Sequence, residues 1–147
     1  RQGANEGKRL GNGFKNQKRR LFSIMDIYTR GVRGAITLNK DTKDDIKIAV
    51  VELLEKMLKE NEIKKEDIAF AIFTTTQDIK ADFPAKHARI ELGYDSIPMM
   101  CYNEAQVKDS LELCLRVLLT INTTKKQNEI KHIYLKGASI LREDLSR

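Results

Sequence analysis

Apolar residues recur along this chain at two spacings, and each spacing predicts one kind of secondary structure. Between residues 111 and 121 every second residue is apolar, which predicts a strand with one wholly apolar face. Residues 68–75 form a short apolar run suited to a buried strand. We expect three further strands at 28–38, 96–102 and 130–141.

A spacing of three and four residues between apolar positions predicts the first helix. Asp41 or Thr42 provides its N-cap, and the helix ends near Asn61. The apolar stripe of this helix is expected to lie in the core and consists of Ile46, Ala49, Val50, Leu53, Leu54, Met57 and Leu58.

A second helix is predicted between residues 82 and 93, because Pro84 suits a first helical position and Gly93 suits the residue past the end. The elements then follow the order β-α-β-α-β-β-β, which indicates an α+β fold with one sheet of about five strands. Two helices on one face of such a sheet leave the other face uncovered. We therefore expect the protein to oligomerise through its sheet.

The positive charge of the chain is concentrated at its N-terminus. The seven cations and one anion of residues 1–20 account for the whole net charge of +6. The remaining sequence is electrically balanced, so it does not indicate a nucleic-acid-binding face. We expect residues 1–27 to form a basic, disordered tail and residues 28–147 to form one domain. Weak nucleic-acid binding by the tail is a lesser hypothesis.

The sequence lacks the motifs of several large enzyme classes. It contains neither G-x-G-x-x-G nor G-x-x-x-x-G-K-[ST], and no Ser-His-Asp or Cys-His arrangement is indicated. His87 and His132 have no metal-like neighbours and are interpreted as surface or helix-flanking residues. Cys101 and Cys114 lack metal-ligand spacing, which favours a cytoplasmic protein. No apolar run approaches the roughly 20 residues of a membrane span.

Two arginines occupy unusual positions. Arg33 lies between Gly31 and Gly34, and glycines within a strand often mark a bulge or a close backbone approach. Arg116 lies in the middle of the alternating segment 111–121. Burial of a guanidinium is costly unless an anion and hydrogen bonds offset the lost hydration. Arg116 therefore lies either on a solvated strand face or at an anion-binding site, and this segment alone leaves both readings open.

The second predicted helix carries a basic side. Phe83, Lys86 and Arg89 are spaced three residues apart, so this side is either solvated or part of a ligand site. Together with Arg33 and Arg116, it would suit a small molecule with two or more carboxylates, because the planar fork of arginine matches carboxylate geometry.

From about Thr29 to Ser146 the chain resembles the monofunctional chorismate mutases of the AroH type, the trimeric class found in Bacillus and its relatives. Residues 1–27 have no counterpart in that family. The resemblance rests on five ordered segments: RGVRGA (30–35), FPAK (83–86) with Arg89 beyond it, CYNE (101–104), CLRVLLTINT (114–123) and KHIYLKGASILREDLS (131–146).

The resemblance implies an isomerase that converts chorismate to prephenate, on the way to phenylalanine and tyrosine. This intramolecular Claisen rearrangement breaks a C–O ether bond, forms a C–C bond, and needs no cofactor or metal. The family also implies a mixed five-stranded sheet of ferredoxin-like topology and a homotrimer that forms a pseudo-α/β barrel. Each active site would lie between two subunits, and neither nucleic acid nor a membrane is an expected partner.

The family's central polar residues are matched in this sequence. By resemblance, Arg116 would donate to the ether oxygen and the enolpyruvyl carboxylate, so that its anion arrives with the substrate. Arg33 and Tyr134 would hold the region of the side-chain carboxylate. Glu104 and the backbone at Cys101 would bind the ring hydroxyl, and the Glu104 carboxylate would favour positive charge on the ring.

The resemblance also assigns residues around the pocket. Phe83 would line it, while Lys86 and Arg89 would shape its mouth and attract the dianion. Leu141 and Arg142, in the C-terminal segment, would close over the site.

One position departs from the family pattern, and one alternative function stands beside the first. Met100 occupies a position where a small polar residue is expected, which would reshape the hydroxyl end of the pocket. The alternative is a trimeric reactive-imine deaminase-like or carboxylate-binding protein of similar architecture. Such a protein would not need Arg33, Glu104, Arg116 and Tyr134 together.

Overall fold

The computed structural model describes residues 26–145. The tail predicted for residues 1–27 lies almost entirely outside the described residues, so it stays a prediction, as does the domain over 28–147. In chain order the elements, with η marking 3₁₀ helices, are β1 (Tyr28–Thr37), α2 (Lys43–Asn61), η1 (Lys65–Asp67), β2 (Ile68–Thr75), α3 (Pro84–Leu92), β3 (Met99–Asn103), β4 (Cys114–Thr123), η2 (Gln127–Glu129), β5 (Ile133–Leu135) and η3 (Lys136–Leu145).

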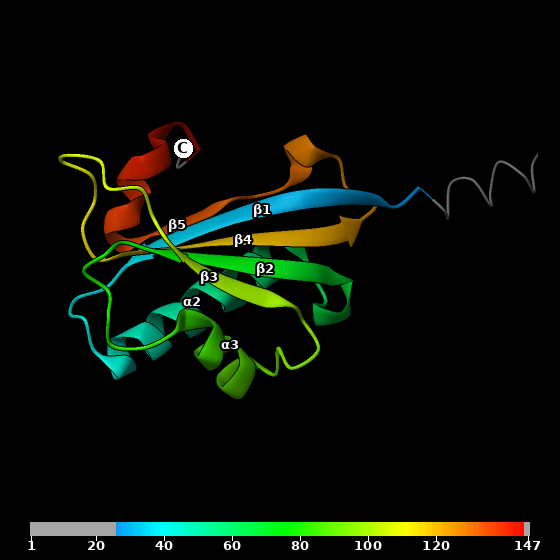
Figure 1. Cartoon of the computed structure of the whole chain (residues 1–147). Helices are drawn as coiled ribbons and strands as arrows, with labels where there is room; N and C mark the ends of the chain where they lie inside the picture. The colour runs from blue at the N-terminus through cyan, green and yellow to red at the C-terminus, as the bar shows by residue number, and fades with distance from the viewer. Residues whose placement is uncertain (1–25, 146–147) are drawn as a thin grey trace, which may run out of the picture.

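The five strands form one mixed sheet in the order β3-β2-β4-β1-β5 (Figure 1). The central strand β4 runs antiparallel to both of its neighbours, β1 and β2. The edge strands β3 and β5 run parallel to β2 and β1. Strands β1 and β2 are therefore parallel with β4 between them, which is the split β-α-β arrangement of ferredoxin-like folds. The predicted α+β class and mixed five-stranded sheet are confirmed.

Both predicted helices are confirmed, with the ends that the sequence indicates. Helix α2 begins after Thr42, whose Oγ1 accepts a hydrogen bond from the N–H of Asp45 at 3.1 Å. Helix α3 begins at Pro84 and is followed by Gly93, which has a φ of 69° in the left-handed region that favours glycine. No helix within residues 26–145 is long and apolar enough to span a membrane.

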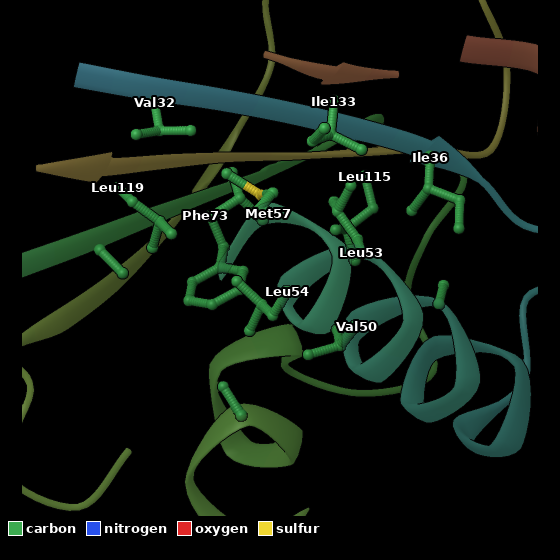
Figure 2. Packing of buried hydrophobic residues seen from close by; sticks show 14 of the residues in the cluster. Val32, Ile36, Val50, Leu53, Leu54, Met57, Phe73, Leu115, Leu119 and Ile133 are labelled. Atoms are coloured by element: carbon green, nitrogen blue, oxygen red, sulfur yellow. The ribbon is translucent and has the colours of Figure 1, made fainter. Parts of the chain in front are cut away.

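The main core lies between the sheet and the two helices, which cover the same face (Figures 1 and 2). Leu54 and Met57 of α2 pack in one cluster with Phe73 of β2 and Leu119 of β4 (Figure 2). The predicted apolar stripe of α2 is buried except at Leu58, which is only partly buried. Burial of this apolar surface is the main force that holds α2 on the sheet.

Of the two alternatives that the sequence leaves open for the glycines of β1, a bulge or a close backbone approach, the structure shows a close approach at Gly34. A methyl group at this position would overlap the thioether of Met57 and lie 3.1 Å from Cδ1 of Leu53. At Gly31 the nearest atom to such a methyl, Cδ1 of Leu118, is at an ordinary 3.6 Å. Glycine at residue 34 thus lets α2 sit directly against β1.

Three strands, β3, β4 and β5, begin three residues later than the sequence pattern predicts. Strand β3 begins at Met99 rather than residue 96, because the N–H of Ile97 bonds the C=O of Tyr94 in a turn. Left-handed conformations limit the other two strands.

Leu113 has a φ of 47°, so β4 begins only at the next residue, Cys114. Lys136 has a φ of 52°, so β5 ends at Leu135. The remaining residues of the predicted strand 130–141 then enter η3.

The face of the sheet opposite the helices, here called the open face, is only partly covered. Segment η3 packs against β1, where Ala138 joins Ala35 and Cys114 in a small buried cluster. The prediction of an uncovered face is therefore wrong beneath η3. Elsewhere the open face exposes large apolar side chains, namely Phe70, Met100, Tyr102 and Leu118.

Candidate active site

Three of the predicted site residues come together on the open face. Cross-strand pairing aligns Thr74 of β2, Arg116 of β4, Ala35 of β1 and Tyr134 of β5 in one row. Directly paired residues point to the same face of a sheet, so these side chains are neighbours. Arg33 lies two residues before Ala35 on β1 and therefore points to the same face.

Glu104 joins this group from the loop that follows β3. Its N–H donates to the C=O of Thr75 at 2.9 Å, and its Oε1 lies 3.0 Å from Nε of Arg116. The Nε–H does not point at this oxygen, so the contact is an ion pair without hydrogen-bond geometry. The hydroxyl of Thr74 donates to the same Oε1 at 2.6 Å.

The ion pair with Glu104 bears on whether Arg116 lies on a solvated strand face or at an anion-binding site. The side chain of Arg116 is 32% exposed and that of Glu104 is 15% exposed, so both charges are partly desolvated. The attraction between them offsets part of the cost of that desolvation. The expectation that the anion for Arg116 arrives with the substrate is therefore incomplete, because Glu104 of the same chain already supplies one.

Arg33 and Tyr134 lie side by side at the β5 end of the row. The Cζ of Arg33 is 6.0 Å from the centroid of the Tyr134 ring, at the outer limit of a cation–π contact. The Tyr134 hydroxyl is buried and has no hydrogen-bond partner among residues 26–145. A buried hydroxyl in this state is costly, and a ligand acceptor would remove the cost.

His132 holds the backbone of Arg33. The N–H of Arg33 donates to Nδ1 of His132 at 2.9 Å. Burial, with the positive charges of Arg33 and Arg142 nearby, lowers the pKa of His132 below its usual value of 6.5. The imidazole therefore stays neutral near pH 7, and Nδ1 remains able to accept this hydrogen bond.

A hollow of about 250 Å³ lies on the open face between the two arginines. Its lining combines apolar side chains with two guanidinium groups, which suits a small anion with an apolar body. The residues that line it are Arg33, Ile72, Thr74, Arg116, Val117 and Leu118.

The C-terminal segment η3 packs on β1 and β5. Leu141 packs against the small buried cluster under η3 together with Tyr134. Arg142 donates two hydrogen bonds to the carboxylate of Asp144, at 2.9 and 2.8 Å. This pairing raises the pKa of Arg142 and lowers that of Asp144. The guanidinium of Arg142 is thus already engaged by a carboxylate.

The other predicted site residues form a second group around α3 and β3. Phe83 and Cys101 line a separate hollow of about 330 Å³, which shares no lining residue with the first. Phe83 is 70% exposed, Arg89 is exposed, and Lys86 is partly buried. The ammonium of Lys86 lies 3.2 Å from Oδ2 of Asp82. Within one chain, this group is not brought into the hollow between the arginines.

Met100 lies between the two groups. It pairs in register with Ile72, which lines the first hollow, and its side chain is 57% exposed. The hydroxyl of Tyr102 donates to its Sδ at 3.2 Å. The departure from the family pattern therefore falls on the open face, at the edge of the sheet.

Sequence reasoning missed Thr74 and misread His87. His87 is inside α3, is only 8% exposed, and has Nε2 3.1 Å from Oδ2 of Asp82, so it is not a surface residue. His132 is partly buried against Arg33. The sequence shows that His132 immediately precedes an apolar strand segment. Its contact with Arg33 depends on the register of β5 with β1, which the sequence does not reveal.

The gathered side chains offer fixed positive charge, one carboxylate and two hydroxyl groups. Such a site can hold a polycarboxylate in one orientation and stabilise negative charge that develops near a guanidinium. Within residues 26–145, no group of three or more His, Cys, Asp and Glu side chains is arranged to hold a metal ion.

Comparisons with known proteins identify the family. The family model "chorismate mutase type I" matches residues 29–145. Over 117 residues, the chain is 40% identical to chorismate mutase AroH of Bacillus subtilis (strain 168), a match that covers 80% of this chain and 92% of that protein. It is 44% identical over 117 residues to chorismate mutase AroH of Thermus thermophilus, with 79% and 95% covered.

A solved structure, that of a chorismate mutase from Clostridium thermocellum, has the same fold. It superposes with a TM-score of 0.73 at 43% identity, and the match covers 75% of this chain and 97% of that one. With this likeness in fold and the family match over most of the described residues, the chain belongs to the chorismate mutase type I family.

Proposed function

We propose that this protein is a chorismate mutase that rearranges chorismate to prephenate in the biosynthesis of phenylalanine and tyrosine. Membership of the family supports the activity. The observation that carries the proposal is the placing of Arg116 against Glu104 and beside Arg33 on one open face. The reactive-imine alternative would not need this set, and no contact among the described residues favours it.

The reaction needs orientation and electrostatics more than proton transfer. In the rearrangement the C–O ether bond breaks as a C–C bond forms across the ring. The transition state is compact and chair-like, with negative charge on the ether oxygen and positive charge on the ring. A site that holds the substrate in this form and presents fixed charges to both ends lowers the barrier.

We assign the two charged ends of the transition state to two side chains that already touch. Arg116 would donate to the ether oxygen and the enolpyruvyl carboxylate. Glu104 would bind the ring hydroxyl with the backbone at Cys101 and favour positive charge on the ring. Arg33 and Tyr134 would hold the other carboxylate region, which would give the buried Tyr134 hydroxyl its missing acceptor.

We further propose that each site is shared between two chains of a homotrimer. Within one chain, Arg33 and Arg116 line one hollow, whereas Phe83 and Cys101 line another. A second copy seated on the open face would cover its exposed apolar side chains and bring Phe83, Lys86 and Arg89 of one chain toward Arg116 of another. Leu141 and Arg142 would then close over the site.

A cytoplasmic location completes the proposal. Both cysteines are free thiols, and burial raises the pKa of each. Free thiols that form no disulfide are typical of proteins in a reducing compartment.

The direct test is the loss of chorismate absorbance after addition of purified protein. We expect catalysed conversion of chorismate to prephenate without any added cofactor. A preparation that is folded by circular dichroism, is an oligomer by measured mass, and leaves chorismate unchanged would contradict the proposal and favour the deaminase-like alternative.

A further inference from the structure

Glu104 lies just past the end of β3, where the backbone is no longer held by strand pairing. Strand β3 ends at Asn103, and the loop up to Leu113 is mostly exposed, with Asp109 at a φ of 61°. The backbone N–H of Glu104 donates a hydrogen bond to the C=O of Thr75. That bond fixes the main chain and leaves the side-chain torsions free. Some other contact must therefore orient the carboxylate.

Thr74 makes that contact. Its hydroxyl donates to Oε1 of Glu104 at 2.6 Å, the short distance expected for a hydrogen bond to a charged oxygen. Thr74 is itself well placed, because it lies within β2 in direct register with Arg116 of β4. Its branched side chain has few rotamers in a strand.

Both contacts of the carboxylate converge on one oxygen. Oε1 accepts from Thr74 and faces Nε of Arg116 at 3.0 Å. Within residues 26–145, the carboxylate of Glu104 accepts a hydrogen bond at Oε1 and none at Oε2. The hydroxyl therefore selects a one-oxygen contact over the two-oxygen fork that carboxylates readily form with arginine. This leaves both Oε2 and part of the guanidinium for another partner.

We propose that Thr74 is a positioning residue for catalysis: its hydroxyl holds Glu104 so that the carboxylate stays beside Arg116 without engaging its whole guanidinium. This inference rests on the proposed chorismate mutase activity. Without the hydroxyl, Glu104 is free to rotate into a two-oxygen pair with Arg116. Such a pair would compete with the substrate for Arg116 and misplace the carboxylate that faces the ring.

The test compares Thr74→Val, which keeps the branched shape, with Thr74→Ser, which keeps the hydroxyl. We expect Thr74→Val to lower kcat/KM by about 10- to 100-fold, the range for one hydrogen bond to a charged group. Most of this loss is expected in kcat. Thr74→Ser should stay within about threefold of wild type. The matched control is Thr120→Val, the same change on the open face of β4 at a residue outside the site.

A double-mutant cycle separates positioning from general damage. If Thr74 acts through Glu104, Thr74→Val should have almost no further effect on kcat in a Glu104→Ala background. Thermal unfolding of the wild type, Thr74→Val, Glu104→Ala and the double variant should show that the effects of the two substitutions on stability are not additive. If Thr74→Val fails to fold, Thr74→Ala takes its place in both cycles.

The outcomes are distinguishable. A wild-type protein without chorismate turnover contradicts the proposed function itself. A wild type that is active, with Thr74→Val within about threefold of it, overturns the positioning role. The same role is overturned if the full loss persists in the Glu104→Ala background, or if Thr74→Ser is as impaired as Thr74→Val.

Discussion

At the scale of single residues, the site depends on contacts that sequence spacing does not reveal. An arginine within the apolar strand segment could be picked out from the pattern alone. Its partner could not, because Glu104 reaches Arg116 only through the register of β2 with β3 and β4. Thr74 was missed for the same reason, since a threonine in a strand is ordinary until its neighbour is known.

His132 gives a residue-scale prediction about stability and pH. Its pKa is lowered by burial and by Arg33 and Arg142, so the unfolded chain binds a proton more readily than the folded one. The contribution of His132 to stability is therefore complete above the unfolded pKa of 6.5 and is lost as the pH falls through the folded pKa.

Urea unfolding of the wild type and of His132→Gln, measured between about pH 5 and 8, tests this. We expect the free energy of unfolding of the wild type to decline below about pH 6.5 more steeply than that of the variant. Equal slopes for the two proteins would contradict the assigned role of His132.

At the scale of elements, apolar periodicity and capping residues locate both helices and all five strands. Pattern alone could not place the strand limits at Leu113 and Lys136, because the backbone of each residue adopts a left-handed conformation that its own side chain does not favour. The N–H of Leu113 donates to the carboxylate of Asp78 at 2.8 Å, a contact made across 35 residues. Tertiary contacts of this kind override local preference.

The packing of α2 on β1 yields an element-scale prediction. We expect Gly34→Ala to lower the free energy of unfolding by about 1–3 kcal/mol, because the added methyl overlaps Met57 and crowds Leu53. Gly31→Ala on the same strand is the matched control, since its methyl meets only Leu118 at 3.6 Å. Denaturant unfolding of both variants decides the point, and equal losses in the two would refute the close approach.

At the scale of the whole molecule, the exposed apolar side chains of the open face and the separation of the two hollows support our proposal that the active site is shared between chains. We expect a homotrimer and expect turnover to require it. Specific activity should fall as dilution shifts the measured mass from trimer to monomer, and it should return on reconcentration. Full specific activity in a demonstrated monomer would rule out a shared site.

The central claim is that fixed charge on Arg116 stabilises the transition state of the chorismate rearrangement. The ether oxygen gains most of its negative charge only as the C–O bond stretches, so under this claim the guanidinium would interact more strongly with the transition state than with bound substrate. Losing one such donor typically lowers kcat by about 10²–10³. Arg30, a strand arginine whose Nε donates to the C=O of Lys125, lies outside the site and provides the control.

The most direct measurement is therefore the kcat for chorismate of wild type, Arg116→Ala and Arg30→Ala, each verified as folded by circular dichroism. We predict that Arg116→Ala loses at least about 10²-fold in kcat with a smaller rise in KM, whereas Arg30→Ala keeps the wild-type kcat. An Arg116→Ala protein with a raised KM and a kcat within a few-fold of wild type would show that Arg116 only anchors the substrate, and it would contradict this account.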